Sequence, residues 1–229
     1  MAYRTPPHVQ EQKDLRRRQI LDAAASLFSS HGYHETSIRD VVEAAGISIG
    51  SFYFYFASKD DLFDALFAEM SEAFLAVMTD ASETTRTDPA GGTAEAIARA
   101  MSLIASNRPL SRFLLLESGA GTTLFEVRRK ANEQRFMTLV HDFLDEMQER
   151  NQIHVTDTAS AACSLMGGLY FSILAWLSEP QGNDLPFRIL HTCLYHLKSL
   201  GLTADPEAIA PRIEAVLARE PSACDCGPL

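Results

Sequence analysis

Apolar residues recur along most of the chain at intervals of three and four, which is the period of an amphipathic α-helix. No segment shows a convincing apolar/polar alternation of the kind that a half-buried β-strand has. Residues 1–12 and 84–93 carry prolines or glycines, so we expect a flexible arm and a loop there. The sequence therefore predicts an all-α fold, with helices over residues 13–31, 37–45, 49–57, 58–82, 94–106, 110–117, 122–151, 157–178, 186–200 and 206–219.

The stretch 36–59 predicts two short helices joined by a tight turn. The apolar residues of the first helix form one helical stripe: Ile38, Val41, Val42 and Ala45. Thr36 or Ser37 can act as the N-cap of this helix, and Asp40 lies three residues after Ser37, which is a variant of the capping box. Gly46 ends the helix, because glycine adopts a left-handed conformation without steric cost.

Ser48 is the expected N-cap of the second helix, in which Phe52 and Phe56 lie four residues apart and point inward. Tyr53 and Tyr55 cannot share that face, so we expect them to point outward. Two helices arranged in this way form a helix-turn-helix, whose second helix enters the major groove of DNA. The alternative is a pair of packed helices that binds no nucleic acid.

The residues of this region resemble the N-terminal signature of the tetracycline-repressor (TetR) family of transcriptional regulators. The similarity covers about residues 15–65 and lies in the segments 20–24, 27–28, 32–33, 36–40, 45–48 and 50–56, followed by Lys59. Ile49 stands where a polar or basic residue is common in the family. The resemblance implies an N-terminal three-helix DNA-binding domain and a larger helical domain for ligand binding and dimerisation. It also favours a repressor over an activator.

We expect double-stranded DNA to be the partner of this helix-turn-helix. Most of its polar side chains would contact phosphates, which position a protein without reading sequence. Arg39 can instead reach a guanine edge, although a phosphate or carboxylate partner fits it equally well, and Ile49 can meet a thymine methyl group. The predicted DNA-binding residues are Ser37, Arg39, Ser48, Ile49, Gly50, Ser51, Tyr53, Tyr55 and Lys59.

The charge distribution is compatible with DNA binding although the net charge is −10. Seven basic and six acidic residues precede or include Lys59, so the acidic excess lies in the rest of the chain. The basic residues Lys13, Arg16, Arg17 and Arg18 either lie along phosphates or form a solvated run. Four cysteines without a framework spacing indicate a reducing compartment, and we expect a cytoplasmic protein with no secretory signal and no membrane span.

One helix-turn-helix reads about half of a binding site, so we expect a homodimer. The two most apolar late helices, 157–178 and 186–200, are the candidates for its interface, and in the resembled family such a pair forms a four-helix bundle. Gly167 and Gly168 would let helices approach closely, or would leave room for a ligand or a bulky neighbour. The predicted interface residues are Leu165, Leu169, Leu190, Leu194 and Leu197.

The remaining helices can surround a cavity for a small-molecule effector that shifts the protein away from its DNA-binding state. An aromatic or methionine stripe is also what a plain hydrophobic core looks like, and the pattern is compatible with both interpretations. The predicted pocket residues are Phe113, Glu117, Arg128, Met137, His141, Met166, Tyr170, Leu174 and Trp176.

These observations predict a DNA-binding domain over residues 1–57, a ligand-binding and dimerisation domain over 58–220 and a disordered tail over 221–229. The predicted function is that of a ligand-responsive regulator that binds a palindromic operator, and the resemblance favours a repressor. We expect no enzyme, no cofactor and no metal site, because no metal-binding histidine pair, phosphate loop or nucleophile elbow occurs. The alternative is a helical small-molecule-binding or thiol-sensing protein that uses Cys224 and Cys226 without binding an operator.

Overall fold

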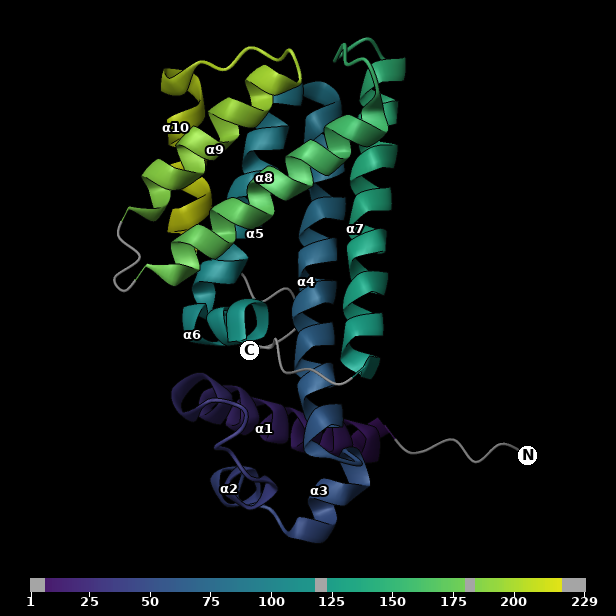
Figure 1. Ribbon diagram of the computed structural model, residues 1–229, viewed down its shortest axis with the longest axis vertical. Helices are drawn as coiled ribbons and strands as arrows, with labels where there is room; N and C mark the ends of the chain where they lie inside the picture. The colour runs from purple at the N-terminus through teal and green to yellow at the C-terminus, as the bar shows by residue number, and fades with distance from the viewer. Residues whose placement is uncertain (1–6, 118–122, 180–183, 220–229) are drawn as a thin grey trace, which may run out of the picture. The chain divides into compact units, whose positions relative to one another are not determined.

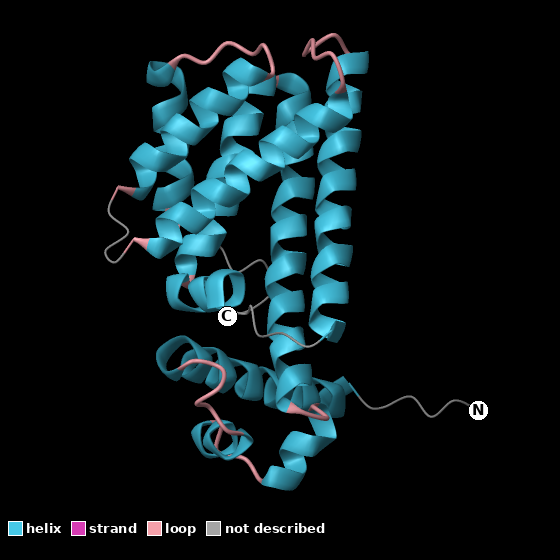
Figure 2. Ribbon diagram, viewed as in Figure 1, coloured by secondary structure: helices cyan, strands magenta, loops and turns pink. Residues whose placement is uncertain are grey.

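The computed structural model describes residues 7–117, 123–179 and 184–219, and these ranges contain helices and no strand (Figures 1 and 2). The predicted all-α fold is confirmed. The elements are α1 (Pro7–His31), α2 (Ile38–Ala44), α3 (Ile49–Tyr55), α4 (Lys59–Thr87), α5 (Pro89–Ser106), α6 (Arg108–Arg112), the π-helix η1 (Phe113–Glu117), α7 (Thr123–Glu149), α8 (Thr158–Ser178), α9 (Leu185–Ser199) and α10 (Pro206–Ala218).

The described residues divide into two compact units, one that ends at Met70 and one that begins at Ser71. Helix α4 spans this division, because its first twelve residues belong to the first unit and the rest to the second. The sequence placed the boundary at residue 57, where the helix-turn-helix motif ends. The first unit also includes the start of α4, where Leu62, Phe63 and Leu66 are buried.

The first unit buries one side chain or more from each of its four helices. Ile20 and Phe28 of α1, Val41 of α2 and Phe52 of α3 are at most 1% exposed. The spacing of such residues at three and four positions is what makes each short helix amphipathic. A helix of seven residues is not stable by itself in water, so packing on α1 and α4 maintains α2 and α3.

The second unit is a bundle in which α5 packs against α9 and α10, and α7 packs against α4 and α8 (Figure 1). Between α7 and α8 lies an apolar cluster that includes Val140, Leu144, Met147 and Leu165. At the corner between α4 and α5, the backbone of Thr85 lies 2.5 Å from the point that a Cβ on Gly92 would occupy. Glycine is therefore required there for a close approach of two helices.

Two expected irregular segments are helical in the structure. Helix α1 begins at Pro7, so part of the expected arm belongs to it. The expected loop 84–93 is reduced to Asp88, which caps α5 by accepting a hydrogen bond from the backbone N–H of Gly91 at 3.0 Å. Pro89 follows as the first residue of α5, where a missing N–H has no cost. Proline and glycine here mark a sharp corner between helices.

Two arginines of α6 bind the C-terminal end of α8. The Arg108 guanidinium donates to the carbonyl of Trp176 at 3.0 Å and lies 4.8 Å from the centre of the indole ring. Arg112 donates to the carbonyl of Leu177 at 2.7 Å. The last carbonyls of a helix have no partner within it and carry partial negative charge, so these guanidinium groups stabilise the end of α8.

Helix α8 is long and apolar enough to cross a membrane by length and composition alone, which the sequence pattern did not suggest. Only 33% of its most apolar window is buried within the single chain. Core helices of soluble proteins pass the same test, and α8 packs against α7 and α9 on part of its surface. The apolar surface of α8 is therefore only partly covered by the helices of its own chain.

Candidate functional site

Local interactions fix both ends of the turn between α2 and α3. The Ser37 hydroxyl accepts from the backbone N–H of Asp40 at 3.3 Å, while the Asp40 carboxylate accepts from the N–H of Ser37 at 2.7 Å. These bonds from Ser37 hold the pKa of Asp40 below its usual value, so the carboxylate stays charged. Gly46 has φ of +63°, and Ser48 caps α3 through the N–H of Ser51 at 3.1 Å. The predicted capping box, glycine stop and second cap are all present.

Helix α3 is anchored by two phenylalanines and presents aromatic side chains to solvent. Phe52 is 0% and Phe56 3% exposed, and their ring centres lie 5.9 Å apart. Tyr53 is 55% exposed and Phe54 66% exposed. The expected inward placement of Phe52 and Phe56 and outward placement of Tyr53 are found, whereas Tyr55, also expected to point outward, is half-buried. The side of α3 that carries Tyr53 and Phe54 is free to approach another molecule.

The predicted DNA-binding residues fall into two groups by exposure. Six have side chains or, for glycine, backbone at the surface: Ser37, Arg39, Ser48, Ile49, Gly50 and Tyr53. The other three are half-buried: Ser51, Tyr55 and Lys59. Phe54 was missed by the sequence reasoning, although it is the most exposed large side chain of α3. Its position two residues from both buried phenylalanines was the signal that could have found it.

Lys59 has partners within the chain. Its ammonium group donates to the carbonyl of Tyr33 at 2.7 Å and to the carbonyl of Thr36 at 2.9 Å. The Tyr33 hydroxyl in turn donates to Asp60, and burial together with that carboxylate raises the pKa of the phenol. An ammonium group has three donors, so one remains for a phosphate. Lys59 thus joins the start of α4 to the segment between α1 and α2.

The basic run of α1 also faces the rest of this unit. Arg17 and Arg18 form ion pairs with Glu69 of α4 at 2.8 and 3.3 Å. The Lys13 ammonium lies 5.5 Å from the centre of the Phe54 ring, and the Arg17 guanidinium lies 5.5 Å from that of Phe56. The basic residues of α1 are therefore not only solvated charges, because they contact side chains of both α3 and α4.

Comparison with known proteins decides the family. The protein-family model described as "Bacterial regulatory proteins, tetR family" matches residues 20–66 of the chain. These residues contain α2, α3 and the turn between them. The chain belongs to the TetR family of bacterial regulatory proteins. The resemblance of the helix-turn-helix signature is thereby confirmed, and this TetR-family chain is a DNA-binding transcriptional regulator.

The similar proteins align with this TetR-family regulator over different fractions of its length. The "Fatty acid metabolism regulator protein" of Bacillus subtilis is 26% identical over 76% of the chain and 90% of its own length. The repressor KstR2 of Rhodococcus jostii is 42% identical, but over 27% of the chain and 31% of its own length. The higher identity is thus confined to a short part of each chain.

Solved structures agree with the regulator's fold. PfmR from Thermus thermophilus, a TetR-family regulator, has a TM-score of 0.64 at 22% identity and covers 81% of this chain and 99% of its own. The regulator FadR from Bacillus subtilis, solved in complex with stearoyl-CoA, has a TM-score of 0.66 at 21% identity and covers 80% of this chain and 96% of its own. At such identities the likeness establishes the fold.

The structure does not bring the predicted pocket residues of this TetR-family regulator together in one site. Met137 and Met166 pack against the apolar cluster between α7 and α8, and His141 lies 3.4 Å from Asp145 on α7. Tyr170 is exposed, whereas Trp176 is buried beneath Arg108. Phe113 is buried in η1 and Leu174 is half-buried in α8, while the side chains of Glu117 and Arg128 lie outside the described residues.

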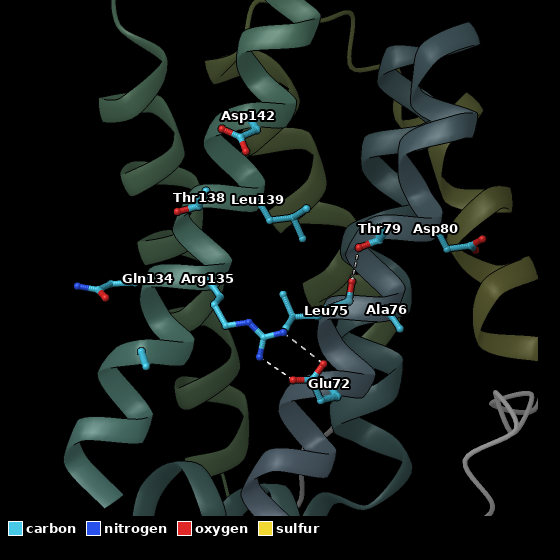
Figure 3. Close-up of a pocket in the computed structure, with 11 residues that line it drawn as sticks. Glu72, Leu75, Ala76, Thr79, Asp80, Gln134, Arg135, Thr138, Leu139 and Asp142 are labelled. Atoms are coloured by element: carbon cyan, nitrogen blue, oxygen red, sulfur yellow. Dashed lines mark hydrogen bonds and ion pairs between the residues drawn. The ribbon is translucent and has the colours of Figure 1, made fainter. Parts of the chain in front are cut away.

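An open groove of about 940 Å³ lies between α4 and α7 (Figure 3). Arg135 crosses it and pairs with both carboxylate oxygens of Glu72, at 2.6 and 3.4 Å. This ion pair holds the pKa of Glu72 below its ordinary value. None of the predicted pocket residues lines the groove, whose walls are Glu72, Leu75, Ala76, Thr79, Asp80, Ala131, Gln134, Arg135, Thr138, Leu139 and Asp142.

Three of the five leucines assigned to a dimer interface belong to the chain's own core. Leu165, Leu169 and Leu197 are at most 8% exposed, and Leu190 and Leu194 are half-buried. The surface of the same two helices carries aromatic side chains that the prediction did not select: Tyr170, Phe171, Phe187 and Tyr195. An apolar helix does not reveal by periodicity which of its faces meets a partner, and this explains the difference.

The close approach expected at the glycine pair is found at Gly168 within one chain. The His196 ring of α9 lies 2.8 Å from the point that a Cβ on Gly168 would occupy. His196 is 2% exposed, and burial lowers the pKa of its imidazole. A Cβ on Gly167 would meet no atom within 4 Å, so Gly167 faces open space in the single chain.

Proposed function

We propose that this TetR-family regulator is a homodimeric, cytoplasmic repressor that binds a two-fold symmetric operator and is released by a small-molecule effector. The observation that carries the DNA-binding part is the two-sided character of α3. Phe52 and Phe56 hold the helix to its unit, while Ile49, Tyr53 and Phe54 are 48%, 55% and 66% exposed. A rigid helix with one free face is what entry into a major groove requires.

The phosphate contacts of the proposal come from the residues around α3. Ser37, Ser48 and Tyr53 are exposed at the ends and on the open face of the motif, where hydroxyl groups can donate to phosphate oxygens. Lys59 would add its third donor to the same strand. Such contacts fix the register of α3 on the duplex, and Arg39 of α2 would read a base edge next to it.

The dimer is supported by the aromatic surface of α8 and α9. Phe171 and Tyr195 are each 70% exposed and Phe187 is 58% exposed, on two helices that pack together. Large contiguous apolar surface on a single chain marks an interaction site. A second copy of the chain is the partner that two half-sites demand, so these residues are assigned to the interface between two copies.

The effector would bind in the helical domain formed from Ser71 onwards. A fatty acid metabolism regulator is 26% identical over most of the chain, and a structural neighbour holds stearoyl-CoA. We therefore choose long-chain acyl-CoA as the first effector to test. Release follows by linkage if the ligand binds more tightly to the form that does not fit DNA.

Selection of genomic fragments by the full-length protein tests the proposal and yields the operator sequence in the same step. Bound fragments are recovered, and the protected bases are mapped by footprinting with and without stearoyl-CoA. The proposal predicts two protected half-sites of inverted sequence about 10–10.5 base pairs apart or a multiple of that spacing. Recovery of random fragments with no common symmetric sequence would contradict operator binding, and protection that acyl-CoA leaves unchanged would contradict this effector class.

A further inference from the structure

The open face of α3 carries almost none of the side chains that usually read bases. The helix has the sequence IGSFYFY, without Arg, Lys, Asn, Gln, Asp or Glu. Bidentate hydrogen bonds from those side chains are the common means of telling one base pair from another. Only Arg39 supplies a lysine or arginine side chain within α2 and α3. Apart from the hydroxyl groups of Ser51, Tyr53 and Tyr55, the side chains of α3 therefore offer only apolar groups to the base edges.

Ile49 and Phe54 are the apolar side chains that α3 exposes most clearly, at 48% and 66%. At about 100° per residue, Phe54 lies roughly 200° from both buried phenylalanines and so points directly away from the core. Its ring is held in place by an edge contact with the Tyr55 ring at 5.0 Å and by the Lys13 ammonium at 5.5 Å. The exposed ring is thus supported on two sides by its own unit.

A single apolar group is offered by the base edges in the major groove, namely the 5-methyl group of thymine. Neither an isoleucine nor a phenylalanine side chain can donate or accept a hydrogen bond. A polar base edge that contacts such a side chain loses its water and gains no hydrogen-bond partner, which is unfavourable. A cytosine or a guanine opposite Ile49 or Phe54 would be disfavoured for that reason. The chemistry of the two surfaces matches only where a methyl group lies.

We propose that Ile49 and Phe54 read the 5-methyl groups of thymines, so that operator preference at these positions follows the pattern of methyl groups. The inference rests on the proposed function, since it names how the same helix recognises its operator. Each side chain reads its own methyl group, and Lys13 beside Phe54 is placed to neutralise the phosphate that the contact brings close. The shared result is selection of thymine at two positions of each half-site.

Deoxyuridine in place of thymidine tests this directly, because it removes the methyl group and keeps every hydrogen-bonding group of the base edge. The probe is a duplex of the selected genomic sequence, and the readout is fluorescence anisotropy with wild-type protein. We expect a loss of roughly fourfold in affinity for each methyl group that is read, the effect of burying one such group. Two positions in each half-site should show this loss, and the remaining thymines should show none.

The variants Ile49→Ala and Phe54→Ala assign the side chains. Each should abolish sensitivity to deoxyuridine at one position while the other position keeps its loss. Both residues are exposed, and circular dichroism checks that each variant remains folded. If Phe54 serves only to pack against Lys13, then Phe54→Ala will weaken binding equally on thymine and deoxyuridine DNA, which would overturn its reading role.

The outcomes separate this inference from the function on which it rests. Tight, specific binding that is the same on thymine and deoxyuridine DNA would overturn methyl reading and leave operator binding intact. Failure of the wild-type protein to prefer any selected duplex would overturn operator binding and methyl reading together. Loss confined to two positions, removed one at a time by the two variants, would establish the inference.

Discussion

The ammonium group of Lys59 lies 4.2 Å from the centre of the Tyr33 ring and donates a hydrogen bond to the carbonyl of the same residue at 2.7 Å. A second bond of 2.9 Å reaches the carbonyl of Thr36. The first residue of α4 therefore holds the segment that leads from α1 into α2. Lys59, which the sequence predicted as a phosphate contact, therefore also stabilises the DNA-binding unit.

Replacing this lysine should lower stability as well as DNA affinity. Lys59→Met removes a charged donor from two carbonyls, and we expect a loss of about 2–3 kcal/mol in the free energy of unfolding. Urea denaturation followed by circular dichroism measures it. Lys130→Met, at an exposed lysine of α7, is the matched control and should change stability by less than about 0.5 kcal/mol. Unchanged stability for Lys59→Met would leave Lys59 with a phosphate role only.

The packing of α8 on α9 predicts a pronounced effect at Gly168. In Gly168→Ala the new methyl group would lie 2.8 Å from Cε1 and 3.1 Å from Nε2 of His196, so the buried ring must move. Overpacking of this kind costs about 1–3 kcal/mol. A double-mutant cycle with His196→Ala should show that the two changes together destabilise less than the sum of each alone. Additive effects would mean that the two residues do not meet.

Burial of His196 also predicts a dependence of stability on pH. Its pKa is lower in the folded chain than in the unfolded chain, so below about pH 6.5 the unfolded state binds more protons. Stability should therefore fall as the pH drops through this region and stay level above it. His196→Gln should remove that part of the pH dependence, as measured by urea denaturation between about pH 5 and 8. Identical profiles for both proteins would be inconsistent with a buried neutral imidazole.

The aromatic surface of α8 and α9 predicts a dimer that one charge can weaken. Phe171→Glu would place two carboxylates at an interface between copies, and we expect the dimer dissociation constant to rise by about thirtyfold or more. Sedimentation velocity over a range of concentrations measures this change. Val127→Glu, at a residue of α7 that is 60% exposed, is the control and should sediment as the wild type does. Equal behaviour of the two variants would place the interface elsewhere.

Much of the first unit could be predicted from the sequence because its signals are local. Ser37, Gly46 and Ser48 each act within three or four residues along the chain: Gly46 and Ser48 were correctly assigned, and Ser37 was one of two candidates for its cap, with Thr36. Phe52 and Phe56 were placed inward by spacing alone. The free face of α3 follows from that placement, and the exposure of Tyr53 agrees with it.

The second unit was less predictable because its decisive contacts are distant in sequence. Arg108 meets Trp176 from 68 positions away, and no local pattern indicates that pair. Helix α8 is apolar over most of its surface, so periodicity did not separate Leu165, which is buried, from Phe171, which is 70% exposed. Cys224 and Cys226, on which the thiol-sensing alternative depends, lie outside the described residues.

DNA binding by the open face of α3 is the central claim, and the affinity of Tyr53→Ala for the selected duplex tests it most directly. Anisotropy titrations at two salt concentrations would compare it with wild type and with Val127→Ala. We predict a loss of about tenfold or more for Tyr53→Ala on every sequence, with an unchanged salt slope, because a neutral phenol that contacts phosphate releases no counterion. Equal affinity of Tyr53→Ala and wild type, at either salt concentration, would contradict the claim.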